Sequence, residues 1–160
     1  MRASSIELKP ELDELRRLER FIRRFCDRNG VTETVRNRTQ LICEEWFVNV
    51  VKHGFGGGGE EAAGAPVPPR ITVRLGMTRR GELTVRLADN GPPFNPDDLP
   101  EPDLALPAEQ RPIGGLGIHL IRRLASRHRY ERTDDRNVLT LFVTEGGQTN
   151  GGNQEGEEPT

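Results

Sequence analysis

The sequence lacks the features of several common classes of protein. No apolar run approaches the roughly 18 residues needed to cross a bilayer, and the amino terminus has no signal-peptide core. We therefore expect a cytoplasmic protein without a membrane partner. Cysteine is scarce as well: Cys26 and Cys43 form neither a CxxC pair nor a metal-ligand pattern. Both are expected to be buried free thiols in a reducing compartment, with no disulfide.

An excess of charge of one sign is also missing. The 160 residues carry a formal net charge of −2 at pH 7, and Lys9 and Lys52 are the only lysines. A general nucleic-acid-binding protein would need a basic patch, so this near balance gives no support for direct nucleic-acid binding. The length fits one domain, which we place at residues 1–144. Residues 145–160 form a glycine-rich, acidic tail with too few apolar residues to fold, and we expect it to be disordered.

Hydrophobic periodicity predicts helices and strands that do not alternate strictly. Helices are predicted at 11–28, 34–53 and 117–127. Strands are predicted at 5–9, 70–77, 82–88, 130–133 and 138–143, the last two as a hairpin around Asp134-Asp135-Arg136. The glycine- and proline-rich stretch 55–69 is a predicted loop, and it lacks the GK[ST] ending of a P-loop. This order indicates an α+β two-layer sandwich with a mostly antiparallel, mixed sheet and helices on one face.

The apolar run from Leu41 to Val51 is interrupted by polar residues that share one helix face. Glu45, Asn49 and His53 are spaced by four, which drifts only about 40° per step on a helix. A buried carboxylate and amide would each carry a desolvation penalty of several kcal/mol without a partner. A metal ion with its phosphate oxygens is such a partner. On this stretch alone, a helix whose polar edge meets water is an equally good interpretation.

Asp89 ends an alternating strand and begins the sequence DNGPPF. When ionised it offers only acceptor oxygens, so it could accept a hydrogen bond from an exocyclic amine. Gly91 would let the backbone approach a flat ring closely. By itself, a plain strand-terminating turn is the better interpretation, because Asp, Asn, Gly and Pro are the residues that turns favour.

A third stretch, with Gly114, Gly115 and Gly117, precedes an apolar pattern that fits a helix starting near Gly117. Glycines at a helix start expose backbone amides, and these amides lie at the positive end of the helix dipole. Together they form an anion site that suits phosphate. A hinge before a packed helix is the alternative.

Together and in this order, the three stretches resemble the boxes of the GHKL ATPases, specifically the anti-sigma regulatory factor type of serine/threonine protein kinase. Glu45-x-x-x-Asn49-x-x-x-His53-Gly54 resembles the N box, Asp89-x-Gly91-x-x-Phe94 the G1 box, and Gly115-Leu116-Gly117-Ile118 the G2 box. Pro93 stands where the wider superfamily often has a second glycine, which favours the kinase subfamily. The resemblance covers about residues 5 to 143, with a lid at 95–113, and implies the Bergerat fold with nucleotide between its layers.

The resemblance implies a role for each matching residue. Glu45 would be the general base that accepts a proton from the substrate hydroxyl as that hydroxyl attacks the γ-phosphate. Asn49 would ligate Mg²⁺ through its side-chain oxygen. Asp89 would bind the adenine amine, and Gly91 would permit close approach of the base.

The remaining positions concern the phosphates and the edges of the pocket. Gly115 and Gly117 would place backbone amides against the phosphates, and Thr140 in the last strand would support the adenine pocket. His53 matches its box without an assigned role, and local hydrogen bonds at a helix end explain it equally well. Arg111 is the cation available in the lid, where it would either clamp a phosphate or remain solvated.

The implied function is an ATP-dependent serine/threonine protein kinase that uses Mg²⁺ and phosphorylates a STAS-type anti-anti-sigma protein. Sequestration of a sigma factor is also implied, and homodimerisation is typical of similar proteins. One alternative is a nucleotide-gated binding module that sequesters a regulator without phosphotransfer. The other is an ATP hydrolase in which the same glutamate activates water.

Overall fold

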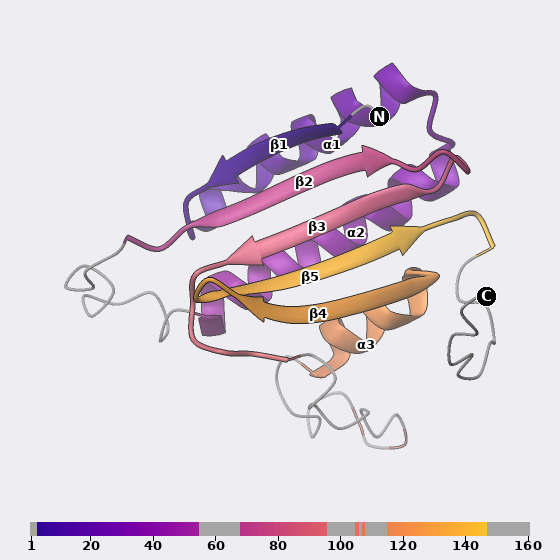
Figure 1. The fold of residues 1–160 in the computed structure, drawn as a ribbon. Coiled ribbons are helices and arrows are strands. Elements are labelled where there is room, and N and C mark those ends of the chain that lie inside the picture. The colour runs from indigo at the N-terminus through magenta and orange to yellow at the C-terminus, as the bar shows by residue number, and fades with distance from the viewer. Residues whose placement is uncertain (1–2, 55–67, 96–104, 106, 108–114, 147–160) are drawn as a thin grey trace, which may run out of the picture.

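A computed structural model of the protein describes residues 3–54, 68–95, 105, 107 and 115–146, with only the backbone given at 53 and 115–119. Most of the predicted lid, including Arg111, lies outside the described residues. So do most of the predicted loop at 55–69 and most of the predicted tail. The described elements form two layers, a five-stranded sheet and a set of helices behind it (Figure 1).

The sheet is antiparallel throughout its described strands. Its members are β1 (Ala3–Leu8), β2 (Ile71–Met77), β3 (Leu83–Asp89), β4 (Arg127–Thr133) and β5 (Arg136–Val143). They lie in the order β1-β2-β3-β5-β4, and each neighbouring pair is antiparallel. Asp134 and Asp135 join β4 to β5 with φ angles of 51° and 58°, which fits the two-residue type I′ turn typical of hairpins. The predicted hairpin is thus confirmed.

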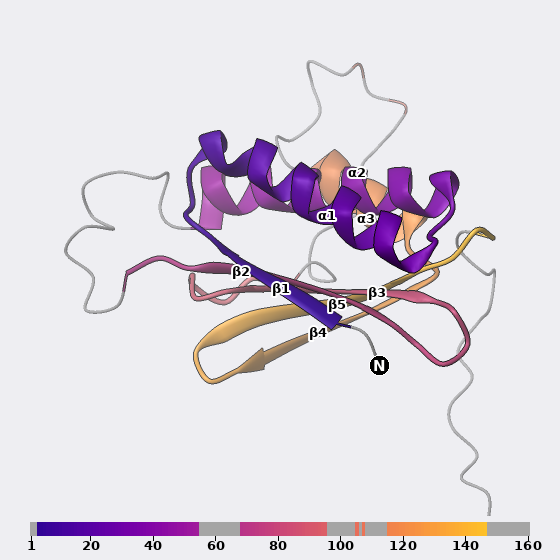
Figure 2. The same cartoon turned by 90° about the horizontal axis from the view of Figure 1, so that it is seen from above.

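All the described helices lie on one face of the sheet, and none of them covers the other face (Figure 2). They are η1 (Leu12–Glu14), α1 (Leu15–Asn29), α2 (Glu33–Asn49), the π-helical turn η2 (Val50–Gly54) and α3 (Gly115–Leu124). The central helix, α2, packs against both α1 and α3. No helix in the described part of the chain is long and apolar enough to span a membrane. The predicted α+β two-layer fold is confirmed, with one correction: the described sheet is antiparallel and not mixed.

Local sequence signals explain the boundary between α1 and α2. Gly30 ends α1 with a φ of 63°, a left-handed conformation that glycine adopts without steric penalty. Two residues later, the Thr32 side chain accepts a hydrogen bond from the Val35 amide (3.4 Å) and caps α2. The turn fixes the direction of α2, and therefore the position of the polar residues at its far end.

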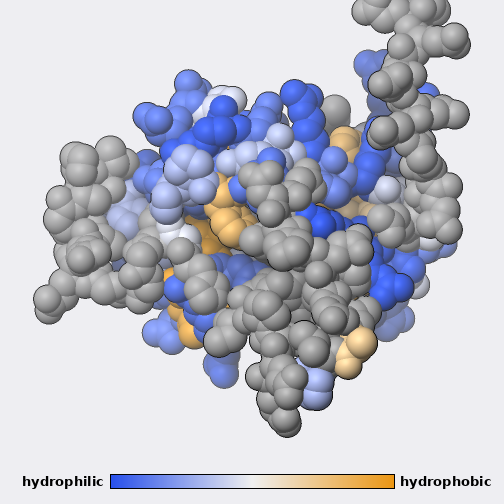
Figure 3. Space-filling view, turned by 90° about the horizontal axis from the view of Figure 1, so that it is seen from below, coloured by the Kyte–Doolittle hydropathy of each residue, from blue (hydrophilic) through white to orange (hydrophobic). Residues whose placement is uncertain are grey.

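The core lies between the two layers. Alternate residues of the strands, such as Val73, Val85 and Leu141, are fully buried against Ile22 and Phe47 of the helices. Burying one such side chain stabilises the fold by about 1.5–3 kcal/mol. Seen from below (Figure 3), the described surface is mostly hydrophilic, with a small hydrophobic area near the centre of the view. This distribution fits a sandwich whose apolar side chains are enclosed between its layers.

Both cysteines belong to this core. Cys26 and Cys43 are buried free thiols, as their apolar positions predict. Burial raises the pKa of the Cys26 thiol to about 11 and raises the pKa of Cys43 as well. Because the thiolate is the reactive form, both cysteines are structural side chains and not nucleophiles.

Candidate functional site

Glu45 and Asn49 lie one turn apart near the end of α2. Both side chains are half-buried, beside the buried Trp46 and Phe47. The Nδ2 atom of Asn49 is buried and has no hydrogen-bond partner among the described residues. A buried polar group without a partner costs about 1–3 kcal/mol. The end of α2 is therefore a place where a bound ligand or ion would supply a missing contact.

The hydrogen-bond pattern of the helix changes immediately after Asn49. Val50–Gly54 form a π-helical turn, and such wide turns are frequent at functional sites. The helix predicted as far as His53 is therefore α-helical only to Asn49. The π-helical turn delivers the Gly54 carbonyl to the loop that follows β3.

Asp89 is the last residue of β3 and lies on the face of the sheet that the helices cover. Only 6% of its surface is exposed. Its Oδ1 atom accepts hydrogen bonds from the Asn137 Nδ2 and from the Gly91 backbone amide, each at 3.0 Å. Among the described residues, both hydrogen bonds to this carboxylate end on Oδ1. The second oxygen, Oδ2, is thus left as an acceptor for a ligand.

Burial raises the pKa of the Asp89 carboxyl above its ordinary value. Three features oppose this effect: the hydrogen bond from Asn137, the hydrogen bond from the Gly91 amide, and the positive charge of Arg132. A carboxylate that is buried and yet supplied with donors on one oxygen is typical of a recognition site.

Asn137, at the start of β5, holds the turn after Asp89 in place, and the sequence analysis did not identify it. Its Nδ2 donates to Asp89 Oδ1 (3.0 Å) and to the Pro92 carbonyl (2.8 Å). Its Oδ1 accepts from the Phe94 amide (3.0 Å) and from the Tyr130 hydroxyl (2.7 Å). With four hydrogen bonds, this buried amide is fully satisfied, and it fixes the shape of the DNGPPF turn.

Thr140 lies on the other face of the sheet. It is opposite Arg86 in the register of β3 and β5, whereas its neighbours Leu139 and Leu141 point into the core. Side chains alternate between faces along a strand, so Thr140 points away from the helices and from Asp89. This placement corrects the prediction: Asn137, and not Thr140, is the β5 residue beside Asp89.

Gly91 joins the two halves of the site. Its carbonyl accepts a hydrogen bond from Arg132 (2.7 Å). A Cβ atom at position 91 would lie 2.5 Å from the Gly54 carbonyl oxygen and 2.9 Å from Asp89 Oδ1. The structure thus gives a direct reason for glycine at this position, which is the close approach of the Gly54 backbone.

Replacement of Gly91 by alanine is therefore expected to destabilise the protein. The added methyl group must displace the Gly54 backbone, and overpacking of this kind typically costs about 1–3 kcal/mol. We expect a lower midpoint in thermal or urea unfolding. Gly146→Ala is the matched control, because nothing lies within 4 Å of a Cβ at that position. Equal midpoints for the two variants would contradict the proposed contact.

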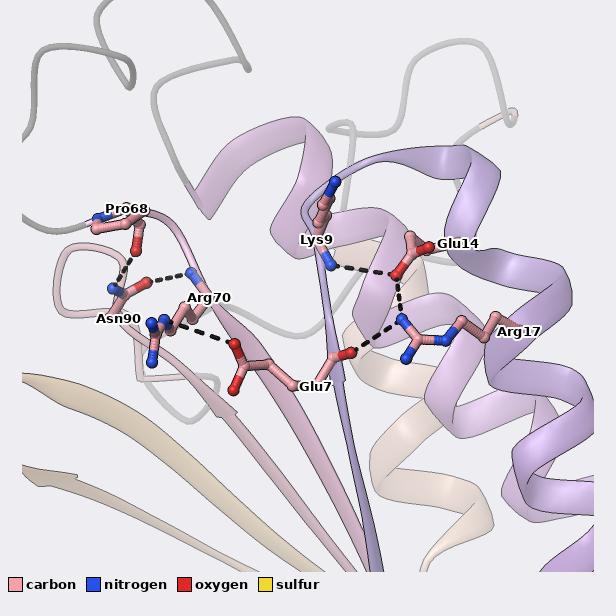
Figure 4. A network of polar contacts seen from close by, with 7 residues as sticks. All are labelled: Glu7, Lys9, Glu14, Arg17, Pro68, Arg70 and Asn90. Atoms are coloured by element: carbon pink, nitrogen blue, oxygen red, sulfur yellow. Dashed lines mark hydrogen bonds and ion pairs between the residues drawn. The ribbon is translucent and has the colours of Figure 1, made fainter.

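The same turn is also fixed by hydrogen bonds to the segment that precedes β2 (Figure 4). Asn90 Oδ1 accepts from the Arg70 amide (2.7 Å), and its Nδ2 donates to the Pro68 carbonyl (2.9 Å). The Arg70 guanidinium forms an ion pair with Glu7 (3.5 Å), and Arg17 donates to the Glu7 carbonyl (3.2 Å). These contacts connect the turn to β1 and α1, so the segment that presents Asp89 is fixed from both sides.

Two of the three predicted segments are thus in direct contact, at Gly54 and Gly91. The third is the start of α3, where Gly115 and Gly117 are the first and third residues of a helix that packs against α2. The helix begins two residues earlier than predicted. That all three segments line one cavity stays a prediction.

Comparison with known proteins identifies the family of the chain. Residues 8–143 match the family described as "Histidine kinase-like ATPase domain", and the chain belongs to this family. Within 101 residues it is 34% identical to the serine/threonine-protein kinase BtrW of Bordetella bronchiseptica. The aligned region covers 63% of this chain and 65% of the relative, so it spans slightly less than two thirds of that protein.

Proposed function

We propose that the protein is an ATP-dependent serine/threonine protein kinase. The observation that supports this most directly is the buried Asp89 carboxylate, which has one oxygen engaged by Asn137 and Gly91 and the other left as an acceptor. The adenine amine is a donor that suits this oxygen. A relative named as a serine/threonine-protein kinase gives independent support.

The phosphate end of the substrate would lie at the end of α2 and the start of α3. Asn49 has a buried amide atom without a partner among the described residues, and rotation of that amide would present its oxygen to a cation. In the described part of the chain no group of three or more His, Cys, Asp or Glu could hold a metal ion. Mg²⁺ needs no such cage, because it commonly binds through one or two protein groups together with substrate phosphates and water.

Each group in the proposed site would then have a distinct role in phosphotransfer. Backbone amides at the start of α3 would bind phosphate oxygens, and bound Mg²⁺ would neutralise their charge. Glu45 would orient the attacking hydroxyl and accept its proton. The hydroxyl oxygen forms a bond to the γ-phosphorus while the bond to the β-phosphate oxygen breaks and ADP leaves. Positioning and electrostatic stabilisation supply most of such catalysis.

The phosphoacceptor would be a STAS-type anti-anti-sigma protein, and a sigma factor would be a second partner. This part of the proposal rests on the resemblance of the three boxes to the anti-sigma type of kinase.

Incubation of the protein with γ-labelled ATP, Mg²⁺ and a STAS-domain protein tests the proposal. We expect label on a serine or threonine of the STAS-domain protein, and no transfer when that residue is replaced by alanine. Label released as free phosphate would instead indicate an ATP hydrolase. Nucleotide binding with neither product would indicate a nucleotide-gated binding module.

A further inference from the structure

The face of the sheet that points away from the helices is unusually rich in arginine. The register of the five strands aligns Ser5, Arg74, Arg86, Thr140 and Arg129 in one row across the sheet. In Figure 1 the viewer looks onto this face, and in Figure 2 no described helix covers it. All three arginines of the row are exposed.

Arg74 and Arg86 are directly opposite each other on β2 and β3. Like charges in this position are destabilising, and a neighbouring carboxylate usually relieves the repulsion. Among the described residues, neither of these arginines has an ion pair. Within the described part of the chain, nothing offsets the unfavourable interaction between these two charges.

Two acids on this face pair with arginines other than Arg74 and Arg86. Glu7 of β1 pairs with Arg70 at 3.5 Å, and Glu131 of β4 is 3.5 Å from Arg129. Among the described residues, the arginines of the row without an ion pair are therefore Arg74 on β2 and Arg86 on β3.

A hollow of about 420 Å³ lies over this part of the sheet. Its lining includes one acid, Asp134, but most of its polar side chains are arginines and hydroxyl groups that can donate hydrogen bonds. The residues that supply them are Arg74, Arg86, Arg136, Ser5, Thr72 and Thr133.

We propose that this open face is a docking surface for a short acidic segment of a protein partner. A guanidinium group binds a carboxylate through two parallel hydrogen bonds, and the hydroxyl groups of the hollow donate to the remaining carboxylate oxygens. Carboxylates placed between Arg74 and Arg86 convert the repulsion between them into attraction. The surface is on the opposite side of the sheet from Asp89, so binding there does not require the nucleotide site.

The surroundings favour discrete carboxylates over other polyanions. Glu7, Glu131 and Asp134 lie around the arginines, and they would repel a continuous phosphate backbone that runs beyond the hollow. A second copy of the chain is disfavoured too, because a two-fold interface on this face would place arginines against arginines.

The test uses a rhodamine-labelled peptide of alternating glutamate and serine, with a glutamine-serine peptide as the neutral control, and measures fluorescence anisotropy with the full chain. We expect binding of the glutamate peptide that weakens as NaCl rises from about 50 to about 300 mM. In the double variant Arg74→Gln, Arg86→Gln, affinity should fall about tenfold or more. The matched control Arg79→Gln, Arg80→Gln removes two exposed arginines of the β2–β3 turn and should leave affinity nearly unchanged.

A second measurement reports on the free protein. Arg86→Gln should raise the melting temperature by about 1–3 °C, because it removes the like-charge pair. The proposal is overturned if the wild-type chain does not bind the glutamate peptide, or if both double variants lose affinity equally. Tighter binding of a single-stranded oligonucleotide than of the peptide would also overturn it, as would self-association that depends on Arg74 and Arg86.

Discussion

Replacement of Glu45 by glutamine is expected to lower the rate of phosphotransfer by about 10²- to 10⁴-fold, the usual contribution of a general base. Glutamine keeps the shape of the side chain on α2 but cannot accept the proton of the attacking hydroxyl. Nucleotide affinity should change little, because in the proposed site other residues would bind the adenine and the phosphates. The measurement is a single-turnover transfer assay beside a titration with Mg-ATP.

Glu44→Gln is the matched control for this experiment. Glu44 is the preceding residue on α2, and burial, together with the neighbouring carboxyl groups of Glu19 on α1 and Glu45, raises its pKa. The Glu44 carboxyl group thus lies near α1, and Glu44→Gln should leave the transfer rate nearly unchanged. If Glu45→Gln retained full transfer, or if both variants were equally impaired, the assignment of Glu45 as the base would be wrong.

Replacement of Asp89 by asparagine is expected to weaken nucleotide binding and to raise the stability of the free protein. The asparagine oxygen can still accept from Asn137 and Gly91, but the Oδ2 acceptor becomes an NH₂ donor that opposes the adenine amine. Loss of a hydrogen bond to a charged group costs about 1.5–3 kcal/mol, so ATP affinity should fall about 10- to 150-fold. Calorimetric titration with Mg-ATP measures this change. Unchanged affinity would remove Asp89 from the binding site.

The stability of the free protein should change in the opposite direction. Because burial raises the pKa of Asp89, the folded state takes up a proton here more readily than the unfolded chain does. The contribution of Asp89 to the free energy of unfolding therefore declines as the pH rises from the ordinary aspartate pKa of about 3.9 to the raised pKa of the folded state. Above that window the ionised, buried carboxylate lowers stability, and this deficit persists at neutral pH. Asp89→Asn removes that deficit, so its melting temperature at pH 7 should exceed that of the wild type. The difference should shrink as the pH falls through this window.

The architecture could be predicted because its determinants are local. Apolar residues at helical spacing define α1 and α2, and the alternation of β3 and β5 is plain in the sequence. The polar edge strand β4 begins at Arg127, three residues before the predicted start, because RHRYERT offers no clean alternation of apolar residues. The π-helical turn after Asn49 also has no signature that the periodicity could reveal.

The site was predictable only in part, because some of its residues are defined by register. Asn137 becomes visible as a site residue only when β3 and β5 are paired, which places it opposite Asp89. The alternation of Leu139, Thr140 and Leu141 did carry the signal that Thr140 points outward. Glu45, Asn49 and Asp89, in contrast, stand out as polar residues within or directly after apolar segments.

The contact between Gly54 and Gly91 has a consequence for substrate selection. The turn that ends α2 lies against the same loop that carries Asp89, the proposed ligand of the adenine amine, with no side chain between the two backbones to absorb a displacement. A nucleotide with an ill-fitting base would push this loop and thereby misalign the proton acceptor at the distant phosphate end. A nucleotide with the wrong base would then show a lower rate of phosphotransfer as well as a lower affinity.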